Sequence, residues 1–359
     1  MTMNDRYDAR HESANLDLLR SIAVLCVFMG HFPEMNHRLS LTSWHLGQLG
    51  VLIFFVHTSL VLMQSMERLG LQGRALFTTF YVRRWFRIYP LSMFCVVMAY
   101  ACQVAPDVDH ASRHWNLKEL LSNLSLTQNL FFQPSMVGAL WSLPLEVQMY
   151  VTLPFLYLFF RHRPLWWIIA LYIVSVPVAL IQQRLISRLD VLAYAPCFLG
   201  GMIAWRMAHI NRPKLPGWLW PVAIAAVCPI WFSASREHNL YYRWAFCLML
   251  GLVTPWFKDI QWYWVKSPAK LIARYSYGIY LSHITLMMVF FLYLADYSAI
   301  VRWLVFVTLC VTVPVTLYHL LEAPLIEVGR NLTRRNVRPR AHDQNLEPAT
   351  PLAVTSLST

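Results

Sequence analysis

The chain has 359 residues, of which 57% are hydrophobic and only 13% are charged. Soluble domains carry about 25% charged residues, and most apolar runs of this chain lack polar faces at helical or strand spacing, which argues against a soluble fold. The formal net charge is +12, but the basic residues lie in short loops and in the C-terminal tail. This charge therefore indicates membrane topology, and no nucleic-acid partner is expected.

Ten apolar segments are long enough to cross a bilayer, where a helix satisfies its own backbone hydrogen bonds in the absence of water. The sequence therefore predicts an all-α protein, a polytopic transmembrane bundle of about ten helices. The transmembrane domain is expected at 16–325, between a cytoplasmic N-terminal segment at 1–15 and a basic, partly disordered cytoplasmic tail at 326–359. The predicted spans are 16–32, 47–66, 88–105, 141–160, 165–182, 189–208, 217–233, 240–257, 275–295 and 301–322.

The orientation of these spans follows from the distribution of Lys and Arg. With the N-terminus in the cytoplasm, the segments between spans hold 21 Lys and Arg residues inside and 8 outside. Basic residues near the ends of a span resist translocation, so this asymmetry favours ten spans with both termini in the cytoplasm.

The first span carries Asp17, Arg20 and His31. A charged side chain at the centre of a bilayer costs about 2.5 to 3.5 kcal/mol, so such residues usually face a protein interior or a wet cavity. The alternative for Arg20 is that its side chain reaches the cytoplasmic surface. Eleven residues separate Arg20 from His31, roughly 16 Å of helix, which places Arg20 near the inner surface and His31 near the outer one.

The third span is entered through YVRRWFRIYP, Tyr81 to Pro90. Guanidinium groups bind phosphate oxygens bidentately, so Arg83, Arg84 and Arg87 are candidates to bind a phosphate-rich ligand. Arginines beside aromatic residues also anchor helices at the inner membrane surface, and this alternative remains open.

The longest loop, 106–140, is external in this topology and could cover or gate an outward-facing site. The seven cysteines lie within or at the ends of apolar segments, without a CxxC pair or metal-ligand spacing. They are predicted to be small core side chains.

The fourth span begins with WSLPLEVQMY, Trp141 to Tyr150. By the same topology, Glu146 lies near the outer surface, at a depth similar to that of His31. A carboxylate beside an imidazole can fix its tautomer and stabilise the imidazolium, so the two side chains are predicted to form a general-base pair. Alternatively, Glu146 only ties helices together. The substrate-binding residues predicted from this motif are Trp141, Ser142, Gln148 and Tyr150.

The ninth span carries YSYGIYLSHI, Tyr275 to Ile284. Ser276, Ser282 and His283 could line a cavity, and Ser282 and His283 are predicted to bind substrate. The hydroxyl groups could instead bond the preceding helical turn.

Taken together, these motifs resemble the acyltransferase-3 family of integral membrane O-acyltransferases, which modify sugars and other hydroxylated acceptors. The resemblance rests on the order and positions of LDLLRSIAVLCVFMGHF (16–32), GVLIFFVHTSL (50–60), RRWFRIYP (83–90), WSLPLEVQMY (141–150), YSYGIYLSH (275–283) and LEAPLIEVGR (321–330). It implies ten core helices, a cytoplasmic acyl-CoA donor and a hydroxyl acceptor often reached from the outer side.

The resemblance also implies residue roles. His31 matches the proposed catalytic histidine of the family and Arg20 its first-helix arginine. Arg84 and Arg87 match the third-helix arginines, and Glu146 matches the acid of the Trp-Ser-Leu motif. The second motif departs from the family pattern, because Leu52 stands where an acid is common and residues 57–59 replace the usual apolar-Ser-Gly.

The residues and the resemblance together predict an enzyme that transfers an acyl group, by default acetyl, from acyl-CoA to a hydroxyl of a cell-surface carbohydrate or glycoconjugate. Arginines 83, 84 and 87 would bind the donor phosphates. His31, oriented by Glu146, would deprotonate the acceptor hydroxyl or briefly carry the acyl group itself, and Arg20 would assist. The expected location is the bacterial cytoplasmic (inner) membrane.

Two other classes of protein remain open. A secondary transporter or exporter of a glycan or lipid-linked intermediate would also need ionisable residues in the membrane, although the chain lacks an inverted repeat. A purely structural membrane subunit is the third. No GxSxG, P-loop, HExxH or GxGxxG motif is present, so no metal or nucleotide-hydrolysing chemistry is expected.

Overall fold

The computed structural model describes residues 13–34, 41–103, 114–186, 190–235 and 239–337. Throughout these ranges every extended element is a helix, and β-structure is limited to an isolated bridge between Leu215 and Phe257. The predicted all-α fold is therefore confirmed. The helices are α2 (Ala14–Glu34), α3 (Leu41–Leu69), α4 (Gly73–Ala101), α5 (Leu117–Leu124), α6 (Leu143–Phe160), α7 (Leu165–Leu185), α8 (Val191–Met207), α9 (Trp220–Phe232), α10 (Asn239–Val253), α11 (Tyr263–Met288), α12 (Ala299–Leu317), α13 (Ala323–Leu332) and α14 (Arg334–Val337).

Short 3-10 and π segments adjoin several of these helices. The 3-10 segments are η2 (Gly138–Ser142), η3 (Gly217–Leu219) and η4 (Thr254–Trp256), and the π segments are η5 (Val289–Tyr293) and η6 (Tyr318–Glu322). The segment η5 extends α11 and η6 joins α12 to α13, so the last helices form two nearly continuous rods.

Helices overlap all ten predicted spans, and six of them are long and apolar enough to cross a membrane. These six are Ala14–Phe32, Thr42–Leu69, Gly138–Phe160, Leu165–Leu185, Tyr263–Tyr293 and Ala299–Leu332. Val191–Met207 and Gly217–Phe232 are shorter apolar helices. The chain is thus a multi-pass membrane protein, while the number ten and the cytoplasmic termini stay predictions.

Two helices begin well before the predicted spans. Helix α4 begins at Gly73 rather than near residue 88, and α11 begins at Tyr263 rather than near residue 275. In both cases polar residues in the first turns lower the hydropathy without preventing the helix. As a result Arg84 and Arg87 lie well inside a long helix instead of just before its start.

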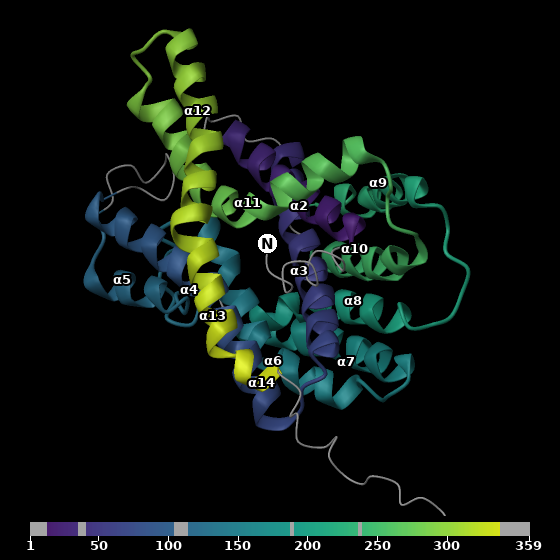
Figure 1. The fold of residues 1–359 in the computed structure, drawn as a ribbon. Coiled ribbons are helices and arrows are strands. Elements are labelled where there is room, and N and C mark those ends of the chain that lie inside the picture. The colour runs from purple at the N-terminus through teal and green to yellow at the C-terminus, as the bar shows by residue number, and fades with distance from the viewer. Residues whose placement is uncertain (1–12, 35–40, 104–113, 187–189, 236–238, 338–359) are drawn as a thin grey trace, which may run out of the picture.

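The close contact between α2 and α3 depends on glycine. A Cβ atom on Gly30 would lie 2.3 Å from the backbone nitrogen of Gly47, and one on Gly50 would lie 2.3 Å from the carbonyl oxygen of Ala23. Small residues of this kind let two membrane helices approach to backbone contact. Figure 1 shows α2 and α3 near the centre of the bundle, with α7 to α10 on one side and α4 and α5 on the other.

The C-terminal helices pack along α4. Arg83 Nε donates to Thr333 Oγ1 at 2.9 Å, and Asn336 Nδ2 donates to Thr79 Oγ1 at 3.2 Å. Between them, Gly329 lies so close to Phe86 that an added Cβ would be 2.9 Å from the phenylalanine Cβ. The predicted tail at 326–359 therefore begins as helix, and its residues 338–359 lie outside the described part of the chain.

Part of the predicted external loop is folded. Helix α5 begins with a capping box, in which Asn116 and Glu119 each accept a hydrogen bond from the other's backbone N–H. Asn123 is buried and bonds the backbone of Pro134 and Met136, which orders the return to η2. Residues 106–113 lie outside the described ranges, and a gating role for this loop stays a prediction.

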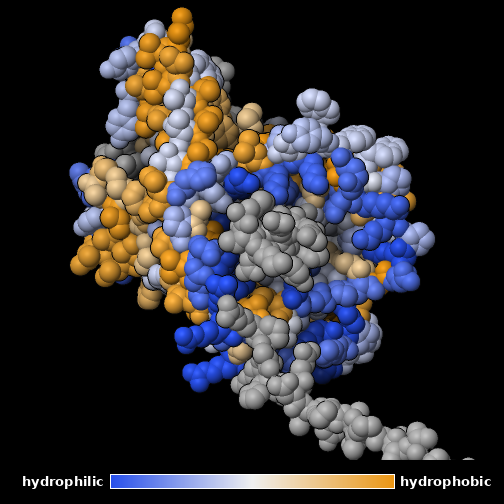
Figure 2. Space-filling model, viewed as in Figure 1, coloured by the Kyte–Doolittle hydropathy of each residue, from blue (hydrophilic) through white to orange (hydrophobic). Residues whose placement is uncertain are grey.

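The surface is divided by polarity. In Figure 2 hydrophilic residues gather across the middle of the viewed face, whereas hydrophobic residues cover the projecting start of α12 and much of the side formed by α4 and α5. Ile300 and Leu304 on α12 are 80% and 68% exposed. Large apolar side chains left uncovered along a helix are expected where the protein contacts lipid.

Candidate active site

A cavity opens between helices that are far apart in the sequence. Its empty volume, including the opening to solvent, is about 770 Å³. It is lined by Arg20 of α2; Phe54, Phe55, His57, Thr58, Val61 and Leu62 of α3; Arg84, Arg87 and Ile88 of α4; Ser142 of η2; Leu143, Glu146 and Tyr150 of α6; and Ser276, Tyr277 and Tyr280 of α11.

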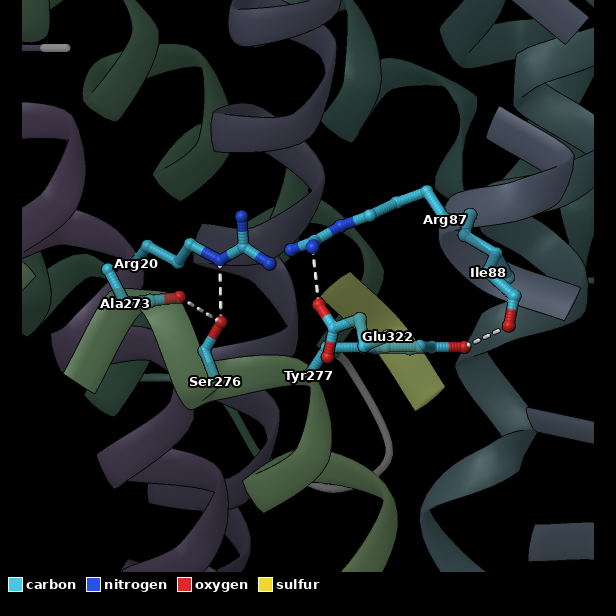
Figure 3. A network of polar contacts seen from close by, with 7 residues as sticks. All are labelled: Arg20, Arg87, Ile88, Ala273, Ser276, Tyr277 and Glu322. Carbon is cyan, nitrogen blue, oxygen red and sulfur yellow. Dashed lines mark hydrogen bonds and ion pairs between the residues drawn. The ribbon is translucent and has the colours of Figure 1, made fainter. Parts of the chain in front are cut away.

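Three arginines meet in this cavity. Arg20 Nε donates to Ser276 Oγ at 2.6 Å, and Ser276 in turn donates to the carbonyl of Ala273 at 2.8 Å. Arg87 approaches from the opposite side, and Figure 3 shows the two guanidinium groups pointing toward one another. Arg84 adds a third cation to the lining. Like charges so close together require acidic partners or an anionic ligand.

Two carboxylates partly balance these cations. Glu322, at the end of η6, forms an ion pair with Arg87, and its side chain is only 1% exposed. Its second oxygen, Oε2, is buried without a hydrogen-bond partner among the described residues. Glu146 accepts hydrogen bonds from Thr58 Oγ1, at 3.1 Å, and from the Tyr150 hydroxyl. With three guanidinium groups against two carboxylates, positive charge is in excess around the cavity.

The aromatic side of the cavity is fixed by α11. The Tyr277 hydroxyl donates to the carbonyl of Ile88 at 2.7 Å (Figure 3). The Tyr280 hydroxyl donates to the carbonyl of Ala139 at 2.7 Å and accepts from Ser142 Oγ at 2.6 Å. These hydrogen bonds connect α11 to α4 and to η2, so they fix the relative positions of three elements that line the cavity.

His31 lies outside the lining of this cavity, on the same helix as Arg20. Its Nδ1 is 2.8 Å from the carbonyl oxygen of Val27 and 3.4 Å from Nε2 of His283. Because a carbonyl only accepts hydrogen bonds, Nδ1 of His31 carries the ring proton of the neutral imidazole. Its Nε2 therefore holds a lone pair, which is the state that a general base or a nucleophile needs.

The structure does not join His31 to Glu146, contrary to the predicted pair. Among the described residues no hydrogen bond or ion pair connects them, and Glu146 shares its cavity with Arg20 instead. The prediction from depth alone was wrong because a buried carboxylate is stabilised most by opposite charge, and the arginines supply it. The imidazole of His31 is oriented by a backbone carbonyl.

The other predicted site residues divide into two groups. Arg84, Arg87, Ser142 and Tyr150 line the cavity with Arg20 and Glu146. Apart from the two histidines, the other four predicted site residues lie elsewhere. Arg83 donates a hydrogen bond to Thr333, and Gln148 exchanges hydrogen bonds with Asn129. The ring of Trp141 packs 6.0 Å from that of Tyr194, and Ser282 donates to the carbonyl of Gly278. The donor-binding role of Arg83 and the substrate-binding roles of the other three stay predictions, because none of the four lines the cavity.

Thr58 in the cavity lining and Glu322, the ion-pair partner of Arg87, were not predicted as site residues. Thr58 stands in the segment where the second motif departs from the family pattern, and it holds Glu146. Glu322 belongs to the LEAP segment, which the sequence indicated only through the resemblance. Leu52, where an acid was expected, is 1% exposed and packs in the core. Hydropathy gave no signal for Thr58, because a single threonine is tolerated on any membrane helix.

The comparisons with known proteins agree with this geometry. The chain matches the family model described as an acyltransferase domain, of acyltransferase-3 type, over residues 13–319. No curated protein and no solved structure matches. The matched region contains every residue that lines the cavity, together with His31 and His283. The chain belongs to the acyltransferase-3 family and is a membrane acyltransferase.

Proposed function

We propose that the protein is an O-acyltransferase that takes an acyl group, by default acetyl, from acyl-CoA and transfers it to a hydroxyl of a cell-surface carbohydrate or glycoconjugate. The observation that carries this proposal is the convergence of Arg20, Arg84 and Arg87 on one cavity. Phosphate groups are the ligands that such guanidinium clusters bind best, and acyl-CoA brings several of them. The family match favours a transferase over the exporter that would need similar buried charges.

In this proposal the arginines bind the donor and His31 acts on the acceptor. The lone pair on His31 Nε2 takes the proton of the acceptor hydroxyl as its oxygen attacks the thioester carbonyl. The C–S bond then breaks, and the CoA thiolate leaves and takes up a proton. In the second route, Nε2 attacks the thioester itself and passes the acyl group on to the hydroxyl.

The route is decided by incubating the purified protein with radiolabelled acetyl-CoA in the absence of acceptor. Label bound to the wild type and absent from His31→Ala supports the acyl-histidine route. Transfer to added acceptor without any bound label supports direct attack.

The proposed role of His31 is tested by turnover. We expect His31→Ala to lower transfer by about 100-fold or more, because a positioned general base contributes about 10²- to 10⁴-fold. Acetyl-CoA should still bind with little change, since His31 does not line the arginine cavity. His162→Ala, on the exposed turn after α6, is the matched control. Undiminished transfer by His31→Ala would overturn the proposal.

The acceptor is tested in cells. The surface glycans of a deletion strain should lack acyl groups that reappear with the wild-type gene but not with His31→Ala. Mass spectrometry of these glycans measures the difference. An exporter would change the amount of glycan at the surface without changing its mass.

A further inference from the structure

The ring of His31 meets a second histidine from a different helix. His283 of α11 is 1% exposed, and its ring centroid is 5.1 Å from that of His31, in an edge-to-face arrangement. Its Nε2 lies 3.4 Å from Nδ1 of His31. The residues are 252 positions apart in the sequence.

The tautomers of both rings follow from their backbone partners. His283 Nδ1 is 2.7 Å from the carbonyl oxygen of Tyr280, so it carries the proton and leaves a lone pair on Nε2. His31 Nδ1 carries its proton toward the carbonyl of Val27. The lone pair of His283 therefore faces the N–H of His31 and accepts the longer branch of a shared hydrogen bond. The single N–H of His31 is thus shared between the Val27 carbonyl and Nε2 of His283.

We propose that His283 is a positioning residue, whose Nε2 lone pair fixes the ring orientation of His31 and stabilises the imidazolium that forms when His31 takes the acceptor proton. This inference rests on the proposed function of His31. On protonation, the N–H at Nδ1 of His31 becomes a stronger donor, so its bond to His283 strengthens in the transition state. The acceptor proton is taken up at Nε2 of His31, whereas His283 contacts Nδ1, so the step itself leaves His283 neutral.

The surroundings of His283 leave little room for a role in binding substrate. Its ring lies 6.2 Å from that of Phe28 and 6.0 Å from that of Tyr280, and the side chain is fully enclosed. Tyr280 itself lines the arginine cavity. His283 thus lies between the cavity wall and His31, where it holds the base without contacting the acceptor.

The test compares two amide substitutions that differ only in reach. The amide of His283→Gln comes close to the position of Nε2 and its oxygen can accept from His31, whereas the amide of His283→Asn comes close to Nδ1 and reaches only the Tyr280 carbonyl. We expect His283→Asn and His283→Leu to lower kcat by about 10- to 100-fold with little change in the KM for acetyl-CoA. His283→Gln should recover most of kcat. Equal activity of the Gln and Asn variants would overturn the inference.

A second measurement observes the tautomer of His31 in the wild-type protein. In protein labelled with ¹⁵N-histidine, the signal of His31, assigned by its loss in His31→Ala, should show a protonated Nδ1 and an unprotonated Nε2. In His283→Leu the same tautomer should persist, because the Val27 carbonyl still accepts from Nδ1, but the Nδ1 signal should shift because its second acceptor is lost. A protonated Nε2 in the wild type would contradict the proposal.

The proposed function of His31 and the proposed role of His283 are contradicted by different results. If His31→Ala retains transfer, the proposed function fails and His283 has no base to position. If His31→Ala is inactive while His283→Leu is fully active, only the role of His283 fails. Thermal unfolding of each variant in detergent distinguishes a variant that fails to fold from a folded variant that has lost catalytic activity.

Discussion

A buried carboxylate in a membrane helix has to be held by donors, and Glu146 has two neutral ones. Thr58 and Tyr150 donate to it from α3 and from its own helix, while Arg20 and Arg84 interact with it electrostatically. A charged acceptor that loses one donor keeps its desolvation cost. The hydroxyl groups therefore position the carboxylate among the arginines.

Removing one of these donors should weaken both stability and turnover. We expect Tyr150→Phe to lower the free energy of unfolding by about 1 to 3 kcal/mol and to raise the KM for acetyl-CoA, because Glu146 would then draw closer to an arginine. Thermal unfolding and steady-state kinetics check this. Tyr263→Phe, where the ring is 71% exposed, should change neither. A Tyr150→Phe enzyme with wild-type kinetics would show that Glu146 does not depend on this hydroxyl.

The sequence predicted many of the chemical groups of the site but not all of their partners. Arg20, Arg84, Arg87 and Glu146 do share one cavity. The pairing of His31 with Glu146 was wrong, because Glu146 lies at the level of Arg20, eleven residues from His31 along α2, so the depth counted from the predicted spans was itself in error. His283, which contacts His31 instead, was predicted as a substrate-binding residue.

At the scale of elements, the central contact is the one between α2 and α3. Gly30 and Gly47 face each other there, yet their surroundings differ. A Cβ on Gly47 would find only His31 Cε1 at 3.8 Å and Gly30 Cα at 3.9 Å, which are ordinary contact distances. A Cβ on Gly30 would overlap backbone atoms that cannot move aside. At this one helix contact, position 30 is therefore expected to be sensitive to a larger side chain and position 47 to tolerate one.

Alanine at these two glycines should give opposite results. Gly30→Ala should separate the helices, lower stability by about 1 to 3 kcal/mol and reduce transfer, because His31 is the next residue. Gly47→Ala should be close to wild type. Melting temperature in detergent and turnover measure both effects. Equal tolerance of the two substitutions would mean that the helices are less closely packed than described.

Hydropathy predicted correctly which segments form helices, but it predicted less well the residues at which the helices begin. All ten apolar segments overlap helices, but the starts of α4 and α11 and the docked helix α13 were missed. Hydropathy averaged over a window indicates which residues can contact lipid. A helix, however, continues wherever its backbone hydrogen bonds are satisfied, including through polar residues. Polar pairs such as Arg83 with Thr333 stabilise those extensions, and they can be identified only once the helices are packed.

For the whole molecule, the ten-span topology makes a direct prediction. An alkaline phosphatase reporter, which is active only outside the cytoplasm, should be active when fused after residue 116 and inactive after residue 162. Fluorescent protein fusions at the same positions should give the reverse pattern. The reason is the excess of Lys and Arg on the side assigned to the cytoplasm. Both reporters indicating the same side for the two positions would show that the count of spans between them is wrong.

The bond between Arg20 and Ser276 joins positions that are 256 residues apart. During synthesis, the first helix enters the bilayer long before the ninth predicted span has left the ribosome. Until then its guanidinium group has to be sheltered by water, lipid headgroups or the insertion machinery. The cavity is therefore completed late in biogenesis, and a chain whose translation stops before α11 lacks the wall formed by Ser276, Tyr277 and Tyr280.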